Sequence, residues 1–132
     1  MRFNTFIANL RNFNEMKREL TDKKDLLSDM YYHHSGVKGC DPSKIPVHGS
    51  EEASADAKLI QAERISELEK EIKWIRETLR LTKKYLNKQE DETRQLLIRL
   101  YLLGENQEKI AKLNGYPNVS KMIRDIKKAY RS

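Results

Sequence analysis

Basic side chains that could bind a polyanion gather near the end of this 132-residue chain. Residues 105–132 hold seven Lys and Arg against three Asp and Glu, so this stretch carries +4 of the overall formal charge of +6. Such a concentration is typical of a segment that contacts nucleic acid, and also of a solvated tail. The candidate DNA-contacting residues share one predicted helix and its start, and they are Asn118, Ser120, Lys121, Arg124, Lys127, Lys128 and Arg131.

The residue types in this group match those that proteins use on double-stranded DNA. Arg124 could read guanine, and Asn118 or Ser120, at the start of the helix, could contact a base or a phosphate. The last three basic residues of the group are better placed for phosphates, and phosphate contacts add affinity but little sequence information. The alternative interpretation is a solvated basic helix that only closes a helical bundle.

A second set of reactive side chains lies in the Gly- and Pro-rich stretch, where His33, His34, Cys40 and His48 could be read as metal ligands. Adjacent histidines rarely ligate one ion together, and the sequence has no CxxC or HxxxH pair, so we expect no metal and no cofactor. The simpler interpretation is a polar loop that contacts a partner. The sequence also lacks a phosphate-binding glycine loop and a nucleophile motif, so we expect no enzyme.

Hydrophobic spacing predicts that an all-α fold positions these residues. An N-terminal amphipathic helix is expected over 1–32, where Phe6, Phe13, Leu20 and Leu27 recur every seven residues. A flexible loop is expected over 33–53, followed by a long central helix over 54–88. Its stripe follows a heptad pattern with Thr82 as the weak point, and it comprises Ile65, Leu68, Ile72, Ile75, Leu79 and Leu86. The two long helices would pair as a coiled-coil-like hairpin or between chains as a homo-oligomer; the pattern does not choose.

The remaining residues, 91–132, are predicted to form a small helix-turn-helix module. A helix with an apolar face that includes Leu97 and Leu103 should end at Gly104, and Asn106 should cap a short helix over 107–113. That short helix should pack through Ile110, Ala111 and Leu113, with the small Ala111 at a close helix crossing. Gly115 permits a positive φ at the corner, and Asn118 can cap the last, basic helix.

The stretch from Thr93 to Tyr130 resembles the region-4-like helix-turn-helix of sigma factors, and in particular the phage late-gene transcriptional regulators of the RinA/ArpU type. The residues that carry the resemblance are Arg99, Tyr101, Gly104, Ile110, Ala111, Gly115, Tyr116, Lys128, Ala129 and Tyr130. The chain differs from the family pattern at Asn114, where an apolar residue is usual, and in its longer turn through Pro117 and Asn118. The resemblance implies a phage or prophage transcriptional regulator that binds promoter DNA and contacts RNA polymerase.

Composition limits the remaining possibilities. The longest apolar run, residues 96–103, contains Arg99 and is too short to span a bilayer, so we expect no membrane partner. A single cysteine excludes an internal disulfide and suits a reducing cytoplasm. The resemblance to phage regulators implies that this is the cytoplasm of a bacterial host cell. The alternative function is a helical phage assembly or DNA-packaging protein of the small-terminase kind, because such proteins also combine long helices with a helix-turn-helix.

Overall fold

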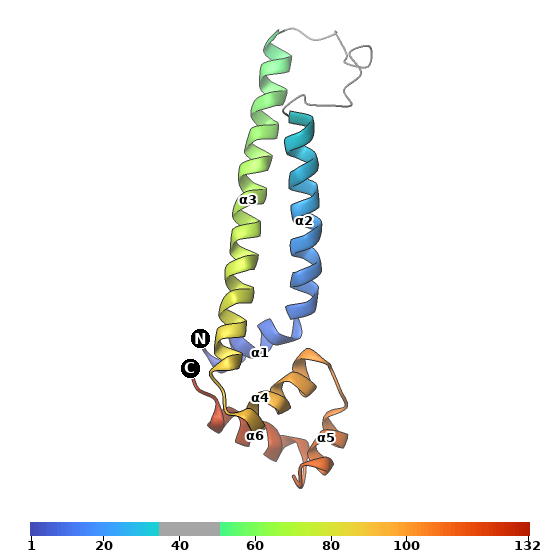
Figure 1. Ribbon diagram of the computed structural model, residues 1–132, viewed down its shortest axis with the longest axis vertical. Helices are drawn as coiled ribbons and strands as arrows, with labels where there is room; N and C mark the ends of the chain where they lie inside the picture. The colour runs from blue at the N-terminus through green and yellow to red at the C-terminus, as the bar shows by residue number, and fades with distance from the viewer. Residues whose placement is uncertain (35–50) are drawn as a thin grey trace. The chain divides into compact units, whose positions relative to one another are not determined.

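The computed structural model describes residues 1–34 and 51–132, and within these ranges it is all-helical, as predicted (Figure 1). The elements in chain order are α1 (Phe3–Arg11), α2 (Phe13–His34), α3 (Glu51–Asn87), α4 (Asp91–Leu97), the π-helix η2 (Ile98–Leu102), α5 (Gln107–Leu113) and α6 (Val119–Ala129). No helix among the described residues is long and apolar enough to cross a membrane.

The chain divides into two compact units. Unit 1 comprises residues 1–17 and 77–132, and unit 2 comprises residues 18–76. Unit 1 contains 16 Lys and Arg against 8 Asp and Glu, a net formal charge of +8, whereas unit 2 contains 10 against 12, a net charge of −2. The whole positive excess of the protein therefore belongs to the unit that contains α5 and α6.

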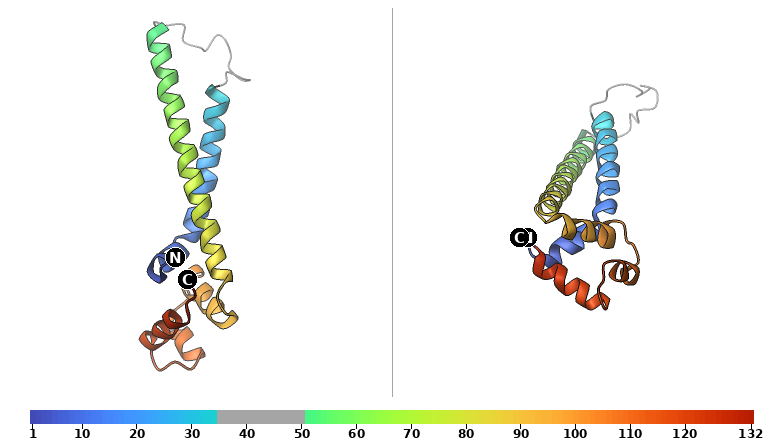
Figure 2. Two further views of the ribbon diagram at one scale, coloured as in Figure 1. Left: turned by 90° about the vertical axis from the view of Figure 1, so that its left-hand side faces the viewer. Right: turned by 60° about the horizontal axis from the view of Figure 1, so that its bottom comes forward.

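Unit 1 is built around one hydrophobic cluster to which α1, α4, η2, α5 and α6 all contribute. The ribbons of α1, α4, α5 and α6 lie close together in both views of Figure 2. The buried members of this cluster, which we call the unit 1 core, are Phe6, Ile7, Leu10, Leu97, Leu100, Tyr101, Ile110, Ala111, Met122 and Ile126. Short helices such as α5 are unstable alone in water, so their stability depends on this shared burial.

The predicted N-terminal helix is broken. The structure has α1 and α2 separated at Asn12, whose φ of −93° and ψ of 2° leave the helical region. On one side of the break, Phe6 and Leu10 of α1 are buried in the unit 1 core, and on the other Phe13 is buried at the start of α2. The seven-residue spacing is present in the sequence, but the helix is interrupted at Asn12, and α1 packs on η2.

The helix that ends at Gly104 changes type before it ends. After α4 the backbone becomes a π-helix, in which the Leu103 amide donates to the Ile98 carbonyl at 2.8 Å. Gly104 then adopts a φ of 66°, so the predicted glycine stop is confirmed. Leu97 is buried as expected, but Leu103 is 63% exposed, because the wider turn of the π-helix rotates it off the buried face.

Unit 2 consists of the remainder of α2 and the first part of α3, which run side by side in opposite directions (Figure 1). Gln61 donates to the Met30 carbonyl at 3.5 Å, and Lys23 forms a 2.6 Å ion pair with Glu71. Hydrogen bonds first to Glu71 and then to Glu19 raise the pKa of Lys23. The predicted stripe of α3 is buried here at Ile65, Leu68, Ile72 and Ile75.

The long central helix starts at Glu51 and ends at Asn87, whereas the sequence predicted 54–88. Thr82, the predicted weak point of its stripe, is fully buried, and its hydroxyl donates to the Thr78 carbonyl at 2.7 Å. This local bond satisfies the polar group, so Thr82 fits a buried position.

Candidate nucleic-acid interface

The helix α5 is held in place by a cap at its start and by two buried side chains. The Asn106 side chain accepts from the amides of Glu108 and Lys109 at 2.9 and 3.2 Å, which confirms the predicted N-cap. Ile110 and Ala111 are buried at 1% and 3% exposure in the unit 1 core. The predicted packing role of Leu113 is wrong, because this side chain is 64% exposed.

The corner after α5 satisfies its own backbone groups. Gly115 has a φ of 76°, a conformation that side chains with a Cβ rarely adopt. The Asn114 side-chain amide donates to the Ile110 carbonyl at 2.8 Å, and the Tyr116 amide donates to the Ala111 carbonyl at 2.9 Å. Asn114 therefore acts as a C-terminal cap, which gives a physical reason for a polar residue before this glycine.

The helix α6 is strongly amphipathic. Its buried side carries Met122 and Ile126, at 0% and 2% exposure, and its half-buried neighbours are Val119, Ile123 and Tyr130. The exposed side carries Ser120 and the four cations Lys121, Arg124, Lys127 and Lys128, which we call the basic face of α6. Lys121, Arg124 and Lys128 have the spacing i, i+3 and i+7, so they form one row that extends about 10 Å along the helix.

The cations of the basic face differ in their ion pairs. Lys121 lies 3.3 Å from Asp125 on the same helix, and both side chains are substantially exposed. Within the ranges that the structure describes, Arg124, Lys127 and Lys128 form no salt bridge with any acidic side chain. An exposed pair of this kind contributes little to stability, so the face can exchange it for another anion at small cost.

Besides Lys121, two more of the seven predicted DNA-contacting residues have partners inside unit 1. The Asn118 side chain accepts from the Lys121 amide at 2.8 Å, which makes it the N-cap of α6 as predicted. Arg131 lies beyond the end of α6, where its guanidinium forms a 2.6 Å ion pair with Glu90. The structure therefore separates Arg131 from the basic face, while the four cations and Ser120 share one helix side.

The end of α6 is anchored to residues that are distant in the sequence. The Tyr130 hydroxyl donates to the Met1 carbonyl at 2.6 Å, and its ring lies 5.2 Å from the ring of Phe6 and 5.4 Å from that of Phe3. Burial, with a further contribution from nearby Tyr85, raises the pKa of the Tyr130 hydroxyl. The buried Gln89 donates to the Arg131 carbonyl and accepts from its amide, both at 2.8 Å. These bonds fix the C-terminal end of the basic helix.

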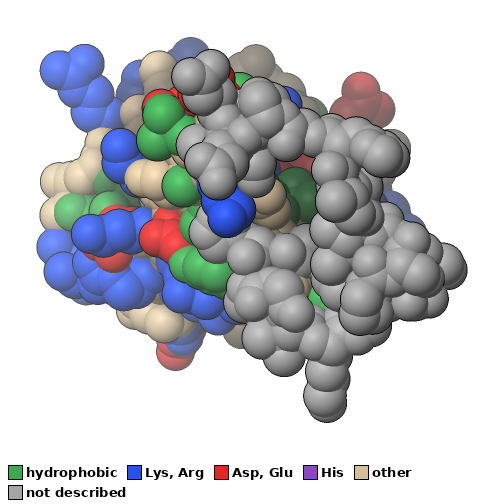
Figure 3. Space-filling view, turned by 90° about the horizontal axis from the view of Figure 1, so that it is seen from above, with side chains coloured by type: hydrophobic (Ala, Val, Ile, Leu, Met, Phe, Trp, Pro, Cys, Tyr) green, Lys and Arg blue, Asp and Glu red, His purple; other side chains and the backbone are tan. Residues whose placement is uncertain are grey.

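The structure also identifies two basic residues that the sequence reasoning did not select. Lys109 and Lys112 are exposed on α5, the helix that precedes the basic helix. Their position on a short capped helix just before the basic helix was the available signal. Lys and Arg side chains also gather on one side of the face seen in Figure 3, with acidic and hydrophobic side chains among them. Exposed positive charge alone therefore does not identify the site.

The other predicted candidates lie outside what the structure describes. Cys40 and His48 fall in residues 35–50, and the side chains of His33 and His34 are not described either. Among the described residues, no group of three or more His, Cys, Asp and Glu side chains could hold a metal ion. Comparison of the chain with protein-family models, with curated proteins and with solved structures finds no match.

Proposed function

We propose that this protein is a phage or prophage transcriptional regulator that binds promoter DNA through a helix-turn-helix formed by α5, the Gly115 corner and α6. The observation that carries the proposal is the basic face of α6. Its row of Lys121, Arg124 and Lys128 lies opposite the buried Met122 and Ile126, on a helix whose two ends are fixed by Asn118 and Tyr130. A rigid helix with cations along its exposed side has the shape and charge that the major groove accepts.

The residues of the interface would then have different roles. Arg124 lies in the middle of the row and would donate two hydrogen bonds to guanine, while Lys121 and Ser120 would contact bases or phosphates near the start of the helix. Lys127 and Lys128 would contact phosphates, and Lys109 and Lys112 of α5 would contact the adjacent backbone. Asn118 would act by capping the helix, and Arg131 would act by holding the tail to Glu90.

Charge and resemblance add partners to this proposal. The net charge of +8 on unit 1 would attract DNA before any specific contact forms, and binding should weaken steeply as salt rises. The resemblance to sigma region 4 adds RNA polymerase as a second partner. The α2–α3 hairpin would supply a surface for self-association, separate from the basic face.

The test is a selection of DNA duplexes by the full-length protein from a random-sequence library and from phage genomic fragments. Selected duplexes are then titrated by fluorescence anisotropy at about 50 mM and about 200 mM salt. The triple variant Lys121→Ala, Arg124→Ala and Lys128→Ala should lose on the order of 100-fold or more in affinity, because three exposed cations leave the interface.

The matched control removes the same charge from unit 2, by Lys24→Ala, Lys58→Ala and Lys73→Ala. These three side chains are exposed on α2 and α3, and we expect the control to bind like the unmodified chain. Equal affinity of the two triple variants, or absence of any enriched sequence, would refute the proposal. Strong binding without sequence preference, together with higher-order assembly, would instead support the assembly or DNA-packaging alternative.

A further inference from the structure

Exposed apolar side chains are concentrated on unit 2. Of the large hydrophobic side chains that are exposed among the described residues, six belong to this unit, namely Leu26, Tyr31, Tyr32, Leu59, Ile60 and Trp74. Only two, Leu103 and Leu113, belong to unit 1. Trp74, the single tryptophan of the chain, lies on α3 and is 66% exposed. Large exposed aromatic and aliphatic side chains on one element are typical of an interaction surface.

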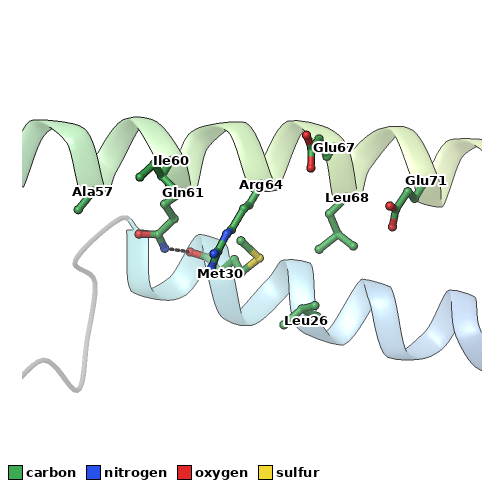
Figure 4. Close-up of a pocket in the computed structure, with 9 residues that line it drawn as sticks. All are labelled: Leu26, Met30, Ala57, Ile60, Gln61, Arg64, Glu67, Leu68 and Glu71. Atoms are coloured by element: carbon green, nitrogen blue, oxygen red, sulfur yellow. Dashed lines mark hydrogen bonds between the residues drawn. The ribbon is translucent and has the colours of Figure 1, made fainter.

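Part of this surface is a groove between α2 and α3, with a volume of about 640 Å³ (Figure 4). Met30 of α2, with Ala57 and Ile60 of α3, makes one end of the groove apolar. Leu26 of α2 lies further along the groove, beside Leu68 (Figure 4). Towards the other end the lining becomes charged, with Arg64, Glu67 and Glu71. A second, adjoining hollow shares Glu71 and continues to Trp74.

Six of the α3 residues that line the two hollows form one stripe along the helix. They are Ala57, Ile60, Arg64, Glu67, Glu71 and Trp74. Their spacing of 3 or 4 residues places them on a single helix face, next to the buried stripe that packs on α2. Unlike that buried stripe, this one has apolar residues at its two ends and a positive and two negative charges between them.

The order of apolar and charged residues along this stripe is complementary to the same stripe on a second copy that runs antiparallel to it. If two copies of α3 lie antiparallel about a two-fold axis at the level of Ser66, Trp74 lies about 12 Å from the axis and Ala57 about 13 Å on the other side. Trp74 of each copy then meets the apolar end of the other groove, where the small Ala57 leaves room for it. In the same register Arg64 of each copy lies opposite Glu67 of the other, while Glu71 keeps its ion pair with Lys23 of its own chain.

We propose that two copies of this chain associate through the stripe on α3, antiparallel and with two-fold symmetry. Trp74 is the anchor, and reciprocal pairs between Arg64 and Glu67 set the register. In a two-fold symmetric contact each copy presents the same surface, so the apolar residues at both ends of the stripe are buried at once. It also joins the units that carry a charge of −2 rather than those that carry +8, so mutual repulsion is small.

The inference specifies the self-association part of the proposed function and is independent of DNA binding, because no residue of the stripe belongs to the basic face of α6. It gives the dimer two basic faces, as regulators with paired half-sites have. Its failure would leave the DNA-binding proposal intact, since the mass of the protein is measured without DNA.

The test is sedimentation velocity of the full-length chain over a concentration series, where a dimer has twice the 15.6 kDa mass of one chain. Arg64→Glu places like charges opposite each other in two symmetric positions, so the dissociation constant should rise on the order of 100-fold. The double variant Arg64→Glu and Glu67→Arg reverses both members of each pair and should restore the dimer. Trp74→Ala should weaken the dimer on the order of 10-fold or more.

The matched control is Lys73→Glu, which makes the same charge reversal at an exposed position on a different side of α3. It should dimerise like the unmodified chain, and circular dichroism should show equal helix content for every variant. A monomer at all concentrations would overturn the proposal, as would equal effects of Arg64→Glu and Lys73→Glu. A double variant that stays as weak as Arg64→Glu would also overturn it, because the partner would then not be a second copy in this register.

Discussion

Tyr130 offers the most direct measure of how the end of the basic helix is anchored. Tyr130→Phe removes one hydrogen bond to the Met1 carbonyl but keeps the ring between Phe3 and Phe6. A neutral hydrogen bond contributes about 1 kcal/mol net. Met1 is only partly buried, so water can replace part of the lost bond. We therefore expect the unfolding free energy to fall by about 1 kcal/mol or less.

Tyr130→Ala removes the ring as well as the hydroxyl. Two aromatic contacts contribute about 0.5 to 1.5 kcal/mol each. Truncation of a fully buried aromatic residue costs about 3 to 5 kcal/mol, and Tyr130 is half-buried, so the lower end of that range applies. The expected loss is about 3 kcal/mol, which leaves a difference of about 2 kcal/mol between the Ala and Phe variants.

The assay is urea denaturation followed by far-ultraviolet circular dichroism. Fluorescence of Trp74 is recorded in parallel, because this residue belongs to unit 2 and reports on it separately. Tyr116→Phe is the control, since Tyr116 is also half-buried against the unit 1 core, and we expect a change below about 0.5 kcal/mol. If Tyr130→Ala were no more destabilising than Tyr130→Phe, the ring would not be packed between Phe3 and Phe6, and the anchoring argument would be refuted.

Two further predictions concern the cap of α6 and the response to alkaline pH. Asn118→Ala removes the capping acceptor and should lower the unfolding free energy by about 1 kcal/mol in a thermal melt. Asn118→Asp keeps the acceptor and should retain stability, but its added negative charge should weaken binding in a DNA titration. If Asn118→Asp bound DNA as tightly as the unmodified chain, the start of α6 would not face DNA. Burial raises the pKa of the Tyr101 hydroxyl above its ordinary value of 10.0, so the folded protein holds this proton more tightly than the unfolded chain does. The contribution of the protonated hydroxyl to the unfolding free energy is therefore fully present below pH 10.0 and is lost as the pH rises above it. Tyr101→Phe should therefore reduce the loss of stability between about pH 9 and about pH 11 in urea denaturation, and an unchanged pH dependence would contradict the burial argument.

Local features of the fold could be predicted from the sequence. The caps at Asn106 and Asn118, the stop at Gly104 and the corner at Gly115 were all expected, and all are present. Each depends on a side chain and a backbone group at most a few residues apart, or on the steric freedom of one glycine. The exposed residues of the candidate site could also be predicted, because the spacing of the apolar residues of α6 shows which side of the helix is buried and therefore which side is exposed.

The features that were not predicted depend on contacts between distant parts of the chain. The helix is broken at Asn12, where no strong local signal marks the break, and the segment before the break packs on the distant η2. Leu113 has the residue type of a core position, yet it is exposed, whereas Ile110 and Ala111 of the same helix are buried in the unit 1 core.

The sequence by itself determined where the short helices α5 and α6 begin, where the corner lies and which residues of α6 are exposed. The tertiary structure decided which of the basic residues share a face, because Arg131 is drawn to Glu90, 41 positions earlier, and Tyr130 to Met1, 129 positions earlier. It also showed that the stripe from Ala57 to Trp74 remains exposed beside α2. The reason is physical: capping and backbone sterics act between near neighbours, whereas burial and ion pairing depend on which segments the complete fold brings together.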